Sequence, residues 1–131
     1  MERFNQSDYP TQLGKVRDLN NRFRPIRIIA ERNSMGEPLC DQLIRDGLPV
    51  QPFTTTQESK RYIVENLAVA FEQDLISIIP DEALINELSI FEGKPTELGV
   101  MKYSAPDGYH DDTVISLALA WSACSMGEAG I

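Results

Sequence analysis

The sequence predicts an α/β sheet protein, and three observations support this. Short apolar runs rich in isoleucine and valine alternate with longer segments in which apolar residues recur at helical spacing. No internal repeat and no linker-like stretch interrupts the alternation. The chain has 131 residues, of which 42% are hydrophobic, so it can bury the core of one domain or of part of one. We expect that domain to cover residues 1–126, followed by a loose, flexible tail over residues 127–131.

The first half of the chain is expected to alternate helix and strand. After residues 1–5, which could end a strand, the expected elements are a helix over 11–23, a strand over 25–30, a helix over 37–45 and a strand over 48–53. The isoleucine-rich strand is short and nearly continuous, as in strands covered on both faces. Gly47 is a typical helix stop. Pro49 and Pro52 predict an edge position or a bend for the strand that contains them.

The second half is expected to contain three helices and two short extended segments. In chain order these are a helix over 57–73, an extended segment over 76–79, a helix over 81–92, an extended segment over 100–103 and a helix over 112–125. We expect the two extended segments to pair as a small hairpin. The last helix is apolar nearly all round, which indicates that it is well buried.

Composition excludes several classes of protein. No apolar run approaches the roughly 18–20 residues of a membrane helix, and the first residues lack a signal-peptide pattern. Cys40 and Cys124 lie far apart without metal-type spacing, which favours a reduced, intracellular setting. The net charge of −8 counts against a general nucleic-acid coat. The negative charge does not count against an enzyme that binds nucleic acid through metal ions held by its carboxylates.

Glu31 is the first candidate functional residue, because it directly follows the apolar strand. In open α/β sheets, ligands bind beyond the carboxyl ends of the strands, so a carboxylate here is well placed to hold a metal. The alternative is that Glu31 ends the strand in solvent or pairs with Arg32.

His110, Asp111 and Asp112 form the second candidate, at the start of the apolar final helix. Capping and the helix dipole explain one aspartate at a helix N-terminus. They explain two adjacent aspartates and a histidine less well. Since the helix is fixed by packing, the pair offers the rigid carboxylates that a divalent cation needs.

Together these carboxylates predict hard-cation chemistry. Two metal ions about 3.5–4 Å apart can activate water and stabilise the leaving oxygen of a phosphodiester, normally with three or more carboxylates. Before the first helix the only acidic residues are Glu2 and Asp8, and neither follows an apolar strand. A hydrolase triad would need His110 as its base, and no Gly-x-Ser-x-Gly elbow exists. Lys60 is more often a solvated charge than a phosphate ligand, and Cys40 is expected to be a small buried residue.

Several segments resemble the C-terminal nuclease domain of phage terminase large subunits. They are Ile28-Ile29-Ala30-Glu31-Arg32-Asn33-Ser34-Met35-Gly36, Thr56-x-x-Ser59-Lys60, Ile76-Ser77-Ile78-Ile79-Pro80, Glu87-Leu88-x-x-Phe91 and Tyr103-x-Ala105-Pro106-x-Gly108-x-His110-Asp111-Asp112. Each is weak alone, but their order and spacing are fairly specific. The resemblance covers nearly all of residues 1–125.

The resemblance implies a ribonuclease H-like fold, with a mixed sheet flanked by helices, and a hydrolase that cuts double-stranded DNA with Mg²⁺ or Mn²⁺. By motif match, Glu31 corresponds to the second catalytic acid, and Asp112 or Asp111 to the third. Lys60 and His110 become possible DNA or phosphate contacts. The implied partners are the terminase motor domain, the small subunit and the portal, in the cytoplasm of a bacterial host and not at a membrane.

One departure from the family's pattern affects the function. The first catalytic aspartate and its strand are not found, so we expect an N-terminally truncated, partial nuclease domain of low activity. The edge of strand 26–30 would then be unpaired, and we expect it to pair with a second copy or with residues 1–5. The alternative function is a non-catalytic prophage remnant or interaction domain that is stable as an oligomer. A resolvase or transposase relative is disfavoured, because its site would be basic and would retain the first aspartate.

Overall fold

A computed structural model describes residues 8–32 and 37–129, with side chains described as far as residue 124. The chain forms two units, residues 1–55 and residues 56–131, where the sequence predicted one domain over 1–126. The expected strand end in residues 1–5 lies outside the described residues.

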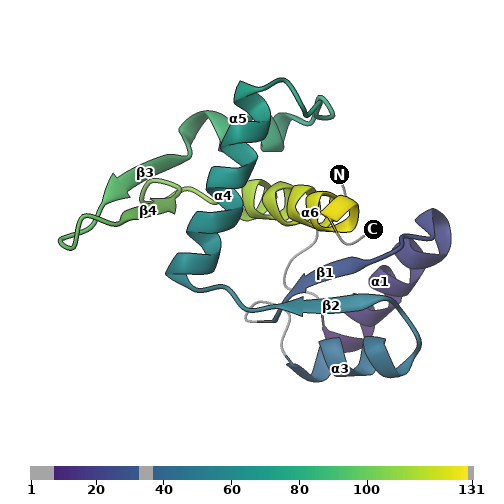
Figure 1. Cartoon of the computed structure of the whole chain (residues 1–131). Helices are drawn as coiled ribbons and strands as arrows, with labels where there is room; N and C mark the ends of the chain where they lie inside the picture. The colour runs from purple at the N-terminus through teal and green to yellow at the C-terminus, as the bar shows by residue number, and fades with distance from the viewer. Residues whose placement is uncertain (1–7, 33–36, 130–131) are drawn as a thin grey trace. The chain divides into compact units, whose positions relative to one another are not determined.

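The first unit is a helix followed by a strand–helix–strand motif (Figure 1). Its elements are α1 (Tyr9–Phe23), β1 (Ile28–Glu31), α3 (Glu37–Arg45) and β2 (Val50–Phe53). The two strands are parallel, and their register places Ile28 opposite Val50 and Glu31 opposite Phe53. Parallel strands need a crossover, and α3 supplies it. In the described part β2 pairs only with β1 and contains Pro52, in agreement with the predicted edge position.

Local signals explain where α1 begins and ends. The Asp8 side chain accepts a hydrogen bond of 2.9 Å from the backbone N–H of Thr11, and Pro10 occupies the first turn. The helix ends at Arg24, whose backbone is left-handed (φ 48°) and whose N–H bonds to the carbonyl of Asn20.

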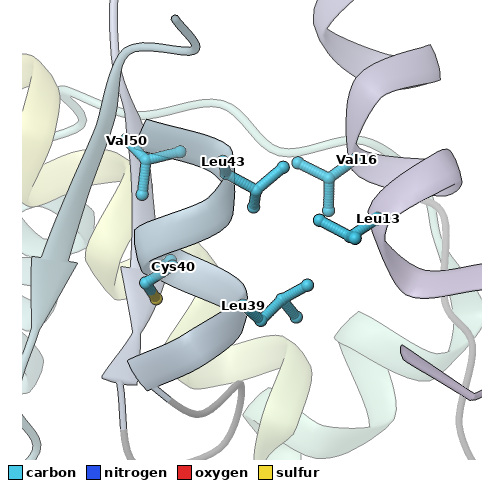
Figure 2. Packing of buried hydrophobic residues seen from close by; sticks show 7 residues of the cluster. Leu13, Val16, Leu39, Cys40, Leu43 and Val50 are labelled. Carbon is cyan, nitrogen blue, oxygen red and sulfur yellow. The ribbon is translucent and has the colours of Figure 1, made fainter. Parts of the chain in front are cut away.

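The core of the first unit lies between the two helices and one face of the strands. Figure 2 shows Leu39 and Leu43 of α3 pointing toward Leu13 and Val16 of α1. Cys40 is buried in the same cluster, as expected for a small apolar residue. In β1 only one of four residues is fully buried, so the expected burial on both faces is incomplete.

The second unit packs two helices against a third. Its elements are α4 (Gln57–Glu72), α5 (Glu82–Ile90), β3 (Glu92–Pro95), β4 (Met101–Ser104) and α6 (Asp112–Ala129). Both α4 and α5 contact α6. The buried residues recur at helical spacing: Ile63, Val64, Leu67 and Ala70 on α4, Leu84 on α5, and Val114, Ile115, Ala118 and Leu119 on α6. The last helix is buried along one face, whereas Leu117 and Trp121 are half-buried and Ala120 is exposed, so its predicted burial is confirmed only in part. The helix continues to Ala129, past the expected end near residue 125 and into the segment expected to be loose.

The hairpin prediction was wrong in one of its two strands. Residues 76–79 form no strand, and β4 pairs in antiparallel fashion with residues 92–95. The pairing places Gly93 opposite Tyr103, whose ring lies so close that a Cβ on Gly93 would be 2.6 Å from it. The Tyr103 ring also stacks on Phe91, with centroids 6.4 Å apart. Residues 92–95 can pair with β4 because Gly93 has no side chain to clash with the Tyr103 ring. An alternating apolar pattern does not reveal this kind of contact.

A hydrogen bond ties the hairpin to α4. The hydroxyl of Tyr103 donates to Glu65 Oε2 at 2.8 Å, and Arg61 lies 3.7 Å from the other oxygen of that carboxylate. The bond to the Glu65 carboxylate raises the pKa of Tyr103, with burial adding to the effect.

Among the described residues, no helix is long and apolar enough to cross a membrane.

Truncating Leu43 should destabilise the first unit strongly. Its side chain is fully buried between α3 and α1, so Leu43→Ala should lower the free energy of unfolding by about 2–5 kcal/mol. The neighbouring Ile44 is 43% exposed, and Ile44→Ala should cost less than about 1 kcal/mol. Urea denaturation of both variants measures the difference, and equal losses would contradict this core.

Replacing Tyr103 with phenylalanine tests the tie between the hairpin and α4. The variant keeps the ring stacking and loses one hydrogen bond, so it should cost about 1 kcal/mol. Because the folded-state pKa of Tyr103 is raised, its bond stabilises the fold below the unfolded pKa of about 10 and is lost as pH rises further. Denaturation from pH 8 to 11 should therefore show a steeper alkaline loss in the wild type than in Tyr103→Phe.

Candidate metal site

Glu31 is the last residue of β1, at the carboxyl end of the sheet of the first unit. Its carboxylate accepts a hydrogen bond of 2.7 Å from the hydroxyl of Thr55, which follows β2. The two meet because parallel strands end at the same edge of a sheet, and Glu31 is in register with Phe53. Arg32, the alternative partner in the sequence analysis, lies 3.8 Å from Glu37. The strand ends therefore orient a half-buried carboxylate.

Asp111 is held by an ion pair within the second unit. Its Oδ2 atom lies 2.9 Å from the Nζ atom of Lys60, and the two side chains are only 24% and 22% exposed. Lys60 lies in the first turn of α4, where Thr56 and Ser59 form a reciprocal capping box. The sequence analysis considered Lys60 as a solvated charge or a phosphate contact, and its observed partner is this aspartate.

The amino end of α6 is capped by a residue from another helix. The carbonyl of Asp111 accepts the N–H of Ile115, so Asp111 occupies the capping position. Its side chain, however, points to Lys60, and the N–H of Thr113 donates to Glu87 Oε1 of α5 at 3.2 Å. Simple self-capping thus does not account for the carboxylate of Asp111.

Asp112 and His110 are exposed on either side of Asp111. Asp112 is the first residue of α6, where a negative charge is favoured by the helix dipole. Within the described part of the chain, its carboxylate makes no hydrogen bond or ion pair. His110 follows a turn in which Gly108 has a positive φ and the N–H of Tyr109 donates to the Pro106 carbonyl.

Two residues of these networks were missed by the sequence analysis. Thr55 lies two positions after β2, the strand that pairs with the one ending in Glu31. Its place just beyond that strand was the only signal in the sequence for a contact with Glu31. Glu87 was noted as part of a motif, without its role as the cap of α6. Both act across long sequence separations, which a local pattern does not reveal.

The predicted site residues are divided between the two units. Lys60, Asp111 and Asp112 belong to the second unit, and Glu31 to the first. Within either unit, as far as it is described, no three His, Cys, Asp or Glu side chains gather closely enough to hold a metal. The convergence of Glu31 with the two aspartates therefore stays a prediction. As donors the three are carboxylates, which suit hard cations such as Mg²⁺ and Mn²⁺.

Comparison with known proteins gives relatives of one kind. No family model matches the chain. It is 27% identical over 123 residues to the large terminase subunits of Thermus phage G20c and of Thermus virus P23-45. These matches cover 93% of this chain and 25% of each relative, so the chain spans about a quarter of their length.

Solved structures agree with this comparison. The large terminase nuclease of thermophilic phage G20c with bound magnesium has a TM-score of 0.81 and 26% identity. The large terminase nuclease domain of Thermus phage P74-26 has a TM-score of 0.78 and 25% identity. The first match covers 92% of this chain and 65% of that structure. Other crystals of the G20c nuclease contain cobalt or zinc. The predicted α/β fold and the resemblance to terminase large-subunit nuclease domains, which are ribonuclease H-like, are confirmed.

Removing the cap at Glu87 should loosen the amino end of α6. Glu87→Ala leaves the N–H of Thr113 without its acceptor and should lower the free energy of unfolding by about 1 kcal/mol. Glu87→Gln keeps an acceptor oxygen and should lose less than half as much. Hydrogen exchange of the first turn of α6 should quicken in Glu87→Ala alone, and unchanged exchange would contradict the cap.

Proposed function

We propose that this chain forms the metal-dependent DNA endonuclease domain of a phage or prophage DNA-packaging terminase large subunit. The observation that carries the proposal is its similarity, over 92% of the chain at a TM-score of 0.81, to a large terminase nuclease crystallised with magnesium. The orientation of Glu31 by Thr55 and the exposed carboxylate of Asp112 support it from the residues of this chain.

In this proposal Glu31, Asp111 and Asp112 hold Mg²⁺ or Mn²⁺ and double-stranded DNA is the substrate. When bound, such ions activate water and neutralise the leaving oxygen of a phosphodiester. Glu31 would enter the site already oriented by Thr55, and Asp112 with its carboxylate exposed. Asp111 and Asp112 would share the metal-binding role. A metal ion would have to compete with Lys60 for Asp111, whereas Asp112 has no such competitor among the described residues.

Lys60 and His110 are the proposed contacts to the DNA phosphates. With Lys60 paired to Asp111, the cluster of Lys60, Asp111 and Asp112 carries a formal charge of −1, so phosphate is repelled less than by the aspartates alone. A cation that binds Asp111 would compete with the Lys60 ammonium and free it for a phosphate oxygen. His110 is exposed beside the pair and would reach phosphate directly.

We infer that the site is incomplete and of low activity in this chain alone. Two-metal phosphodiester cleavage normally uses three or more carboxylates that converge firmly. Among the described residues, no acidic side chain other than Glu31 ends β1 or β2. The motor domain, small subunit and portal are proposed partners in the host cytoplasm, because this chain spans only a quarter of its curated relatives.

A non-catalytic interaction domain, stable as an oligomer, is the second candidate. Strand β1 pairs only with β2 in the described part, and residues 1–7 lie outside it. The edge over residues 26–30 is therefore still proposed to pair with a second copy or with residues 1–5.

Calorimetric titration with Mn²⁺ and plasmid cleavage test the proposal together. The wild type should bind Mn²⁺ weakly and cut slowly, and Glu31→Ala or Asp112→Asn should lower the affinity by tenfold or more. Glu37→Ala removes an exposed carboxylate from the first turn of α3 and should leave both readouts unchanged. Robust cleavage that survives Glu31→Ala would contradict the assigned site. Absent Mn²⁺ binding, together with a stable oligomer in sedimentation, would favour the second candidate.

A further inference from the structure

The end of α1 and the turn that leads to β1 carry a concentrated positive charge. Residues 22–27 contain three arginines and no acidic residue, and we call them the basic segment. The nearest acidic residues along the chain are Asp18 and Glu31. The chain as a whole carries −8, yet residues 1–55 contain eight of its twelve basic and seven of its twenty acidic residues. The negative charge is therefore concentrated in the second unit. The basic segment lies in the first unit, where basic and acidic residues nearly balance.

The arginines of the basic segment differ in pairing from other arginines of this protein. Arg17, Arg32 and Arg61 each lie close to a carboxylate, of Asp46, Glu37 and Glu65 respectively. Within the described residues, none of the arginines of the basic segment forms an ion pair: Arg22, Arg24 and Arg27. Their charge is thus available to an external anion.

Two apolar side chains lie between these arginines and are strongly exposed. Phe23 is 64% exposed and Ile26 is 90% exposed. The guanidinium of Arg22 lies 5.0 Å from the centre of the Phe23 ring, a stacking geometry that orients a charged group without neutralising it. Exposed arginine side chains are typical contacts to the phosphates of nucleic acid.

Arg24 occupies its position at a cost in stability. Its φ of 48° is left-handed, a conformation that costs an L-residue about 1–2 kcal/mol and that glycine adopts freely. Helices that end in this conformation usually carry glycine there. The sequence thus keeps an arginine where the backbone conformation would favour glycine.

We propose that the basic segment binds the phosphate backbone of duplex DNA, as a contact surface separate from the candidate metal site. It precedes the amino end of β1, whereas Glu31 lies at the carboxyl end of that strand, about 10 Å along it. Guanidinium groups match phosphate oxygens in paired hydrogen bonds, and such contacts are independent of sequence. The inference rests on the proposed function, because it assigns part of the surface that receives the DNA.

Salt-dependent DNA binding tests this surface. Fluorescence anisotropy of a labelled 20-base-pair duplex is measured with the full chain, without divalent metal, between 50 and 200 mM NaCl. Replacing Arg22 and Arg27 with alanine and Arg24 with glycine removes three phosphate contacts, so the slope of log K against log salt should fall by about 2.7. The affinity at 50 mM NaCl should fall by tenfold or more.

A matched control removes the same charge elsewhere. Arg45, Lys94 and Lys102 are exposed residues outside the basic segment, and their joint replacement with alanine should change the slope by less than about 1. Arg24→Gly alone should lower the slope by about 0.9 without lowering the melting temperature, since it relieves the left-handed strain. That variant separates loss of binding from loss of folding.

The outcomes distinguish this inference from the proposed function. Wild-type binding with an unchanged slope in the triple variant would overturn the basic segment as a DNA contact and leave the endonuclease proposal standing. Equal competition by poly-glutamate at the same charge concentration would also overturn it, in favour of an acidic protein partner. A wild type that does not bind the duplex at any salt concentration would overturn both this inference and the DNA-binding part of the proposed function.

Discussion

The burial of α6 is the constraint on which the second unit depends. Val114, Ile115, Ala118 and Leu119 form its buried apolar face, and α4 and α5 both pack on the helix. Packing of this kind fixes the amino end of the helix in space. Lys60 from α4 and Glu87 from α5 then reach that end, and they bind Asp111 and the N–H of Thr113. The carboxylate pair is consequently carried on a rigid support.

The first unit orients its acidic residue by a different device. A parallel strand–helix–strand motif brings two strand ends to one edge, where Thr55 donates to Glu31. Its core is a small cluster of apolar side chains between α1, α3 and the strands. Candidate acidic ligands thus stand at the ends of packed strands and helices in both units. Sites built on helices and strands hold their side chains more precisely than sites built on loops.

Much of the fold could be predicted because local interactions report it. The capping of α1 by Asp8 and the box of Thr56 and Ser59 mark helix starts, and the buried residues of α4 recur at helical spacing. The hairpin shows where such signals fail. Its β3 strand, Glu92–Pro95, has no alternating apolar pattern and is selected by the contact of Gly93 with Tyr103. The isoleucines of 76–79 satisfied the pattern without having a partner strand.

The sequence by itself determined most of the alternation of elements, the acidic positions at a strand end and a helix start, and the resemblance to a nuclease domain. These depend on periodicity and on contacts within a few residues, which are written directly in the order of amino acids. Only the tertiary structure decided that Lys60 pairs with Asp111 across 51 positions and that Glu87 caps α6 across 26. Such pairs form when helices pack, so their geometry depends on the whole unit rather than on any short segment.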